Sequence, residues 1–203
     1  MSKIVVLDFD KTITEKDTMY EFYLYCALRN KTSIIYIPVY IIFMLLTKYG
    51  LLSIKKLKEY GLNHFCPKDY LQYKAFSEKY SQKVKINKTH WQKYLTILSN
   101  PNYEVLIVSA SLLEYVKPIF PESKVIASTV KVENNIICGI EHHCYGKNKV
   151  DIIKSMGYNR VDILYTDSYS DMPLAEISSR IYLVRKKYMI EYNSYSDFVA
   201  SKK

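Results

Sequence analysis

The sequence predicts an α/β protein built on a parallel β-sheet, with an all-helical segment inserted after the first strand. Short runs of apolar, mostly β-branched residues recur along the chain, and such runs are typical of strands buried on both faces of a sheet. Helical patterns separate these runs, as right-handed βαβ units require. Residues 16–88 break the rhythm, because they contain helical patterns and no convincing strand. The sequence therefore predicts a Rossmann-like sheet core with a helical cap.

The first predicted strand spans residues 4–7, and the segments that follow the cap alternate between helix and strand. Strands are expected at 104–108, 124–128, 162–165 and 180–184, and helices at 91–98, 112–120, 150–156 and 173–178. Residues 130–140 alternate around Asn134-Asn135, a dipeptide that favours a tight hairpin turn. The run 180–184 is expected to close the sheet, and the basic residues after it are expected to be solvated.

The predicted cap, residues 16–88, interrupts a catalytic core made of residues 1–15 and 89–203. Its helices are expected at 18–28, 53–62 and 70–83. Inserted caps of this kind commonly close a site against water.

Residues 32–47 form an unusual uncharged stretch inside the cap, with Lys31 and Lys48 at its two ends. As one helix it would be roughly 24 Å long, shorter than the ~30 Å hydrocarbon core of a bilayer. Pro38 should kink it or divide it in two. A helix that is apolar on every face must be buried all round. The stretch is therefore expected to contact a membrane surface or a dimer partner, or to lie in the core of the cap.

The net charge of +9 comes almost entirely from lysine, because the chain has only four arginines. Base readout favours arginine, and the chain carries no nucleic-acid motif, so no nucleic-acid partner is expected. A basic field would attract phosphorylated substrates or an anionic membrane, although it could equally serve solubility alone. The four cysteines form no CxxC pair, and Met-Ser-Lys directly precedes the first strand. We therefore expect a cytoplasmic protein with free thiols, in peripheral contact with the inner face of the membrane if residues 32–47 bind lipid.

Polar side chains follow four separate elements of the predicted core. They are Asp8 and Asp10 after the first strand, Ser109 after the second, Lys149 at the start of a helix, and Asp167 and Asp171 after strand 162–165. Strand ends on one edge of a parallel sheet converge in space, which should bring these groups together. Carboxylates without His or Cys nearby favour a hard cation, most plausibly Mg²⁺, while lysine and serine can stabilise phosphoryl oxygens. A simpler alternative is that an acid at this junction only caps the next element.

Four short motifs resemble those of the haloacid dehalogenase-like phosphatase superfamily (HAD fold). Asp8-Phe9-Asp10-Lys11-Thr12 resembles the first motif, Ser109 the second, Lys149 (or, less well, Lys147) the third, and Asp167-Ser168-Tyr169-Ser170-Asp171 the fourth. The resemblance implies that Asp8 is the nucleophile that forms an aspartyl-phosphate and that Asp10 is the general acid/base. It also implies Mg²⁺ ligands: Asp8, Asp10 through its backbone carbonyl, and Asp167, supported by Asp171. Substrate would be bound by Thr12, Asp17, Ser109, Ala110 and Lys149. Thr166 departs from the glycine that many members have at that position.

The helical insertion resembles the branch that contains phosphoserine phosphatase, in which an acid corresponding to Asp17 faces the substrate amine. However, the chain has no arginine between Asn30 and Asn159 to hold a serine carboxylate, and Ser109-Ala110-Ser111 replaces Ser-Gly-Gly. The chain is more similar to the sub-branch of the bacterial phosphatidylglycerophosphate phosphatase, which also has a long apolar run in the cap. That similarity also covers Cys144-Tyr145-Gly146-x-x-Lys149-Val150 and Tyr165-x-Asp167-Ser168.

A Mg²⁺-dependent phosphomonoester hydrolase is therefore expected, with a phosphorylated lipid as its substrate. The alternatives are a phosphatase of a small soluble metabolite and a catalytically idle module that docks on membranes or proteins. Cys138, His142, His143 and Cys144 are close in sequence, but their spacing fits no standard zinc site, so a structural surface cluster is expected.

Overall fold

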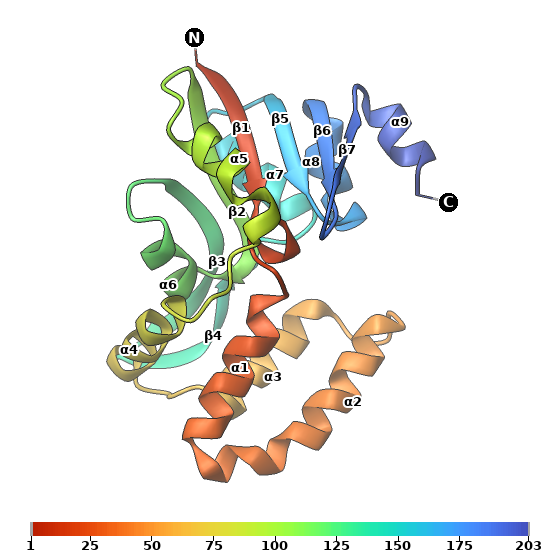
Figure 1. The fold of residues 1–203 in the computed structure, drawn as a ribbon. Helices are drawn as coiled ribbons and strands as arrows, with labels where there is room; N and C mark the ends of the chain where they lie inside the picture. The colour runs from red at the N-terminus through yellow and green to blue at the C-terminus, as the bar shows by residue number, and fades with distance from the viewer. Residues whose placement is uncertain (1, 203) are drawn as a thin grey trace.

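The computed structural model describes residues 2–202 and contains a seven-stranded sheet in the order β4-β3-β2-β1-β5-β6-β7 (Figure 1). The strands are β1 (Lys3–Asp8), β2 (Tyr103–Leu112), β3 (Lys124–Glu133), β4 (Ile136–His142), β5 (Val161–Thr166), β6 (Ser178–Val184) and β7 (Met189–Tyr192). The five inner strands are parallel, whereas β4 and β7 pair antiparallel at the two edges. The predicted α/β class is confirmed.

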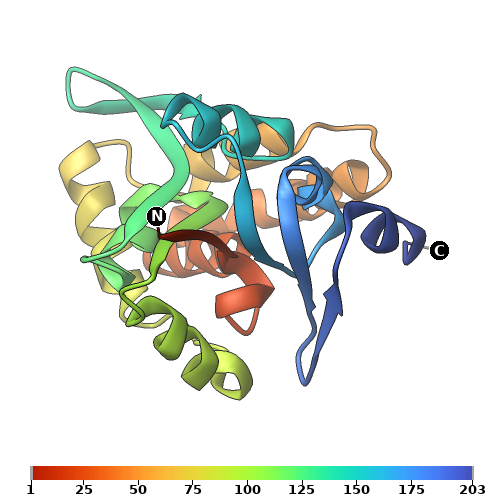
Figure 2. The ribbon, with the colours of Figure 1, turned by 90° about the horizontal axis from the view of Figure 1, so that it is seen from above.

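Helices cover both faces of the sheet. They are α1 (Thr18–Arg29), α2 (Ile37–Lys48), α3 (Ile54–Phe65), α4 (Tyr70–Ser81), α5 (Lys88–Leu98), α6 (Leu113–Val116), α7 (Lys147–Ser155), α8 (Met172–Glu176) and α9 (Tyr195–Ala200). Four tighter or wider turns join them: η1 (Phe9–Ile13), η2 (Lys31–Tyr36), η3 (Lys117–Ile119) and η4 (Tyr169–Asp171). Helices α5 and α7 lie on opposite faces (Figure 2). Val5 and Leu7 accordingly pack into one core cluster and Val6 into the other, as expected for a strand buried on both faces.

Helices α1 to α4 form a separate layer at the carboxyl ends of the central strands (Figure 1). In the described chain between residues 15 and 87, the only β-structure consists of isolated bridges, such as Thr14 with Ile86. Aromatic rings fill this layer: Phe22 on α1 lies with its centroid 4.9 Å from that of Tyr115, which belongs to the sheet side. Gly61 allows α3 to approach α1 closely, because a Cβ atom there would lie 2.5 Å from the Tyr23 ring.

Pro38 divides the apolar stretch of residues 32–47, as predicted. The 3-10 segment η2 ends at Tyr36, and α2 begins at Ile37 with the proline in its first turn, where its missing N–H costs no hydrogen bond.

Two predictions about the core are wrong. The helix expected at residues 112–120 is only the short α6 and η3, because β2 shifts register between Val108 and Leu112 and extends to Leu112. The sheet also does not close at Val184, and the C-terminal residues are not simply solvated. Strand β7 adds an antiparallel edge, and α9 buries Phe198 completely against the sheet.

Candidate active site

The carboxyl ends of β1, β2 and β5 meet at one edge of the sheet, below the helical layer. Register pairs Asp8 with Val108 and Leu7 with Tyr165, so Asp8, Ser109 and Asp167 are brought to the same edge. A cavity of about 210 Å³ opens there. Its lining includes Asp8, Asp10, Asp17, Ala110, Lys149, Asp167 and Asp171. Most of the residues predicted to act together are thus brought together.

Lys149 lies at the centre of the charged groups. Its Nζ atom is 2.8 Å from Asp8 Oδ1 and 2.8 Å from Asp171 Oδ1, and all three side chains are buried. Burial alone would lower the pKa of Lys149, but the two carboxylates raise it above its ordinary value. Lys147, the alternative in the same motif, is exposed. Gly146 precedes α7 with φ of 55°, a conformation that glycine adopts readily, and so directs the chain into this helix.

The Asp8 carboxylate is held on both sides. Lys149 contacts one oxygen, and the Thr12 hydroxyl donates to the other at 3.3 Å. Burial raises the pKa of Asp8 well above its ordinary value; Lys149 opposes that shift, and the neighbouring acids Asp171 and Asp167 add to it. The site therefore has more negative charge than its own lysine compensates.

Thr166 has a clear structural role despite departing from the motif's usual glycine. Its hydroxyl donates to Asp171 Oδ2 at 2.8 Å and accepts from the backbone N–H of Ser168 at 3.1 Å. It thereby fixes the acid that also contacts Lys149.

Asp10 is turned away from the other acids and receives several hydrogen bonds. The backbone N–H and hydroxyl of Thr18 donate to Oδ1 at 2.7 and 2.6 Å. Ser111 donates to Oδ2 at 2.6 Å, and Ser109 is a longer donor at 3.4 Å. The capping alternative is therefore partly correct, since Asp10 accepts from the first N–H of α1. Ser111 was missed, although it lies two residues after Ser109 on the same strand, a spacing that places both side chains on one face.

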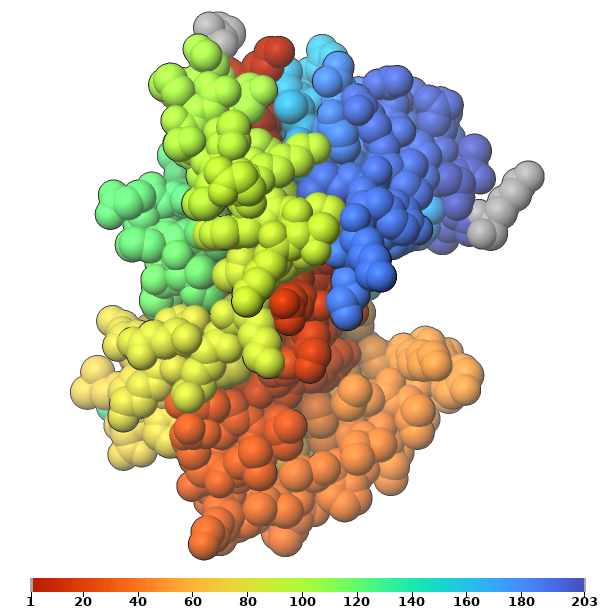
Figure 3. All heavy atoms as spheres, in the orientation of Figure 1, coloured from red at the N-terminus to blue at the C-terminus, as the bar shows by residue number. Residues whose placement is uncertain are grey.

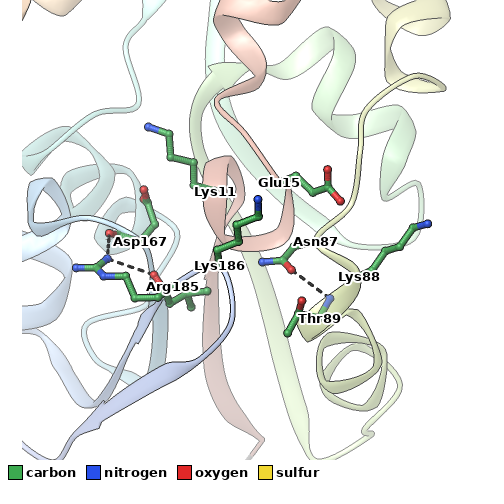
Figure 4. Close-up of a pocket in the computed structure, with 9 residues that line it drawn as sticks. Lys11, Glu15, Asn87, Lys88, Thr89, Asp167, Arg185 and Lys186 are labelled. Carbon is green, nitrogen blue, oxygen red and sulfur yellow. Dashed lines mark hydrogen bonds between the residues drawn. The ribbon is translucent and has the colours of Figure 1, made fainter.

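Asp17 and Asp167 line the same cavity. Burial, with a contribution from Asp10, raises the pKa of Asp17 to about 7, and Lys11 lies 3.8 Å from its carboxylate. Burial raises the pKa of Asp167 to about 6, against the attraction of Lys11. The Arg185 guanidinium donates to the backbone carbonyl of Asp167 at 2.7 Å, next to a second cavity of about 330 Å³ (Figure 4).

Lys58 is a buried residue that the sequence reasoning did not select. It extends from α3 and donates to the backbone carbonyl of Ala110, which also accepts from Ser128 at 2.7 Å. Burial lowers the pKa of Lys58 to about 8. Lys58 therefore connects the helical layer to the end of β2.

Magnesium suits the donors at this edge. Among residues 2–202 no three His, Cys, Asp or Glu side chains are already arranged as a metal cage. However, two carboxylates, Asp8 and Asp167, line one cavity, and burial with mutual repulsion raises the pKa of both. Oxygen donors with surplus negative charge fit a hard divalent cation.

The cysteine and histidine cluster is not a surface cluster throughout. Cys138 is exposed on β4, whereas Cys144 is fully buried with its sulfur 3.9 Å from the Ile126 carbonyl. Since β4 ends between them and the chain turns inward, the four side chains have different environments.

Residues 5–176 match the sequence profile of the haloacid dehalogenase-like hydrolase family. Among solved structures, a phosphoserine phosphohydrolase-like protein from Francisella tularensis is 20% identical, with 89% of this chain and 86% of that chain covered and a TM-score of 0.63. A substrate-bound phosphoserine phosphatase complex is 14% identical, with coverages of 100% and 99% and a TM-score of 0.62. A HAD family hydrolase from Salmonella enterica is 15% identical with a TM-score of 0.64; 87% of this chain is covered, but this chain spans only 60% of that one. No curated protein sequence matches. At these identities the structural likeness concerns the fold.

Proposed function

We propose that this chain, which belongs to the haloacid dehalogenase-like hydrolase family, is a phosphatase that hydrolyses phosphomonoesters through an aspartyl-phosphate on Asp8. The observation that carries the proposal is the buried chain of ion pairs in which Lys149 contacts both Asp8 and Asp171 at the edge of the sheet. A carboxylate held in this way presents a fixed oxygen to a phosphorus atom in the cavity, and positioning is the main requirement for phosphoryl transfer.

The reaction has two steps in this proposal. An Asp8 carboxylate oxygen forms a bond to phosphorus while the bond from phosphorus to the alkoxide breaks, and protonated Asp10 gives its proton to the alkoxide. Asp10 then removes a proton from water as the water oxygen attacks phosphorus, which releases inorganic phosphate and restores the Asp8 carboxylate. Lys149 and the hydroxyls of Thr12 and Ser109 stabilise the negative charge on the phosphoryl oxygens.

Asp8, Asp167 and the backbone carbonyl of Asp10 would hold Mg²⁺, with Asp171 supporting them. When bound, the metal neutralises phosphoryl oxygens and keeps the nucleophile ionised. This assignment is supported by the raised pKa values of Asp8 and Asp167, which indicate acids that lack a counter-charge.

Residues 16–88 act in this proposal as a cap domain on a catalytic core of residues 1–15 and 89–203. Asp17 at the start of α1 and Lys58 on α3 both reach the region above the cavity. The cap would exclude water during phosphoryl transfer, and Asp17 would contact the substrate's leaving group.

The substrate that we favour is a phosphorylated lipid, as in the phosphatidylglycerophosphate phosphatase sub-branch that the sequence resembles. The specific observation in favour is the exposed apolar face of α2, described below. A small soluble phosphomonoester of the phosphoserine kind is the second candidate, because structures similar in fold are named for that activity. The lipid substrate would place the protein at the cytoplasmic surface of a membrane.

Replacement of Asp8 by asparagine tests the nucleophile. An amide is nearly isosteric with the carboxylate but is a very poor nucleophile, so D8N should lose several powers of ten in turnover of an aryl phosphate. The exposed D151N variant is the matched control and should retain full activity. EDTA should abolish wild-type turnover and Mg²⁺ should restore it and raise the melting temperature. Near-normal activity of D8N would show that the nucleophile is assigned wrongly, and full activity in EDTA would exclude the metal.

A further inference from the structure

The outer face of η2 and α2 is apolar and open to solvent. It comprises Ile35, Val39, Ile41, Ile42 and Leu45, all exposed, and we call it the outer face. The loop after α2 extends the same character, since Tyr49 and Leu51 are 73% and 74% exposed. In Figure 3 this orange segment projects from the edge of the molecule, away from the sheet. Contiguous apolar exposure of this kind usually marks an interaction site.

The opposite face of α2 is already occupied by the protein. Tyr40 is buried, with its ring centroid 5.2 Å from that of Phe65, and Phe43 lies 4.7 Å from Tyr60 by the same measure. These contacts fix α2 against α3, so the outer face cannot turn inward. The cap core therefore does not account for it.

The segment Lys31–Lys48 has the length and composition of a candidate membrane span, with a mean hydropathy of 1.4, and only 11% of it is buried. Spanning conflicts with the packing, because the inner face of α2 is held by aromatic contacts to a helix that carries surface lysines. The helix α2 alone is also only about 18 Å long. A helix with one packed face and one open apolar face is suited to lie parallel to a membrane surface.

Charge identifies the kind of surface. Residues 22–58 contain six basic residues and no acidic residue. Lys31 and Lys48 stand at the two ends of the η2–α2 segment, and Lys56 follows the exposed loop. Lysines around an apolar face attract anionic headgroups, with a contribution of about 1 kcal/mol for each lysine near the surface.

We propose that the outer face docks the cap onto an anionic lipid bilayer, with α2 lying in the interface. Side chains such as Ile41 and Ile42 enter the boundary between headgroups and acyl chains, while Lys31, Lys48 and Lys56 contact the headgroups. A second copy of the chain is a poorer occupant, because two such faces would bring like charges together. The docking itself is independent of the hydrolysis; only the further conclusion that the substrate is a lipid rests on the proposed function.

The test is co-sedimentation of the full chain with vesicles of phosphatidylcholine alone and of phosphatidylcholine with phosphatidylglycerol. Wild type should bind the anionic vesicles, and 0.5 M salt should weaken that binding, since charge contributes. I41E/I42E should lower the partition coefficient about 10- to 100-fold, because two half-exposed isoleucines are replaced by charges. L71E/L95E, which changes exposed leucines on α4 and α5, is the matched control and should bind like wild type.

Turnover of a soluble aryl phosphate separates this proposal from the proposed function. I41E/I42E should retain wild-type turnover, because neither residue lines the cavity. Normal turnover with no binding of wild type to anionic vesicles would overturn the docking and leave the hydrolysis intact. Equal binding of wild type and I41E/I42E would overturn the assignment to this face. A dimer that I41E/I42E dissociates, without vesicle binding, would show that a second copy occupies the face instead.

Discussion

Replacing Lys149 by alanine tests the buried ion pairs without relying on any activity. The substitution removes an ammonium that lies 2.8 Å from both Asp8 and Asp171 and leaves two buried carboxylates uncompensated. Breaking a buried pair in this way typically costs about 3–5 kcal/mol. For a chain of this length, that loss should lower the melting temperature by roughly 6–20 °C near neutral pH without Mg²⁺.

The loss should depend on pH in a defined direction. Burial already raises the pKa of Asp8 in the folded state above its unfolded value, and the variant lacks the lysine that opposes this shift. The folded variant therefore binds a proton that the unfolded chain has released, which favours folding at low pH. The difference between wild type and K149A should accordingly be small at pH 4 and grow as pH rises to 7.5 through the raised pKa.

Thermal denaturation followed by circular dichroism, in EDTA at pH 4.5 and 7.5, measures this difference. K147A changes an exposed lysine in the same turn and should match wild type at both pH values. K149A/D171N, in which one of the two stranded charges is removed, should recover part of the loss at pH 7.5. An equal loss for K149A at both pH values, or a loss below about 1 kcal/mol, would refute the reasoning from buried charge.

Two further substitutions address contacts that the sequence did not predict. S111A removes the 2.6 Å hydrogen bond to Asp10, of a charge-assisted kind typically worth about 1.5–3 kcal/mol, so kcat for an aryl phosphate should fall about 10- to 100-fold with little change in KM; an unchanged kcat would show that Ser111 does not position the acid. Lys58, whose pKa burial lowers to about 8, gives the unfolded chain a proton that the folded chain lacks between about pH 8 and 10.5, so wild-type stability should gain up to about 3 kcal/mol from this group as pH rises through that window. K58M should lack that gain in urea denaturation, and an identical pH slope for the two proteins would contradict the burial of a titrating amine.

Much of the sheet could be predicted because its strands are buried on both faces. Val5, Val6 and Leu7 are all fully buried, and an unbroken apolar run is the expected signature of that environment. The convergence of Asp8, Ser109 and Asp167 also follows from the sequence, since parallel strands bring their carboxyl ends to one edge. The edge strand β7 was missed because it is short and half exposed, and so carries no comparable run.

The apolar stretch of residues 32–47 shows where periodicity stops being informative. Apolar residues occupy every face of α2, and the sequence alone therefore left cap core, dimer contact and lipid contact equally open. The structure separates the two faces: Tyr40 packs against Phe65, while Ile41 and Ile42 remain in solvent. That distinction depends on the position of α3, which no local pattern in α2 specifies.

The surroundings of Asp10 could not be predicted for a related reason. Its partners come from two distant parts of the chain: Thr18 begins the first cap helix, and Ser111 lies 101 residues away at the end of β2. Neither serine nor threonine is unusual at its own position, and only the packing of α1 over β2 brings both to one carboxylate. The consequence is mechanical as well as chemical. Since Asp10 is bonded at once to the cap and to the sheet, any movement of α1 away from β2 must break hydrogen bonds to the proposed acid/base. Opening of the cap and positioning of that acid are therefore coupled by these contacts, and a carboxylate oriented before the reaction begins requires little reorganisation during it.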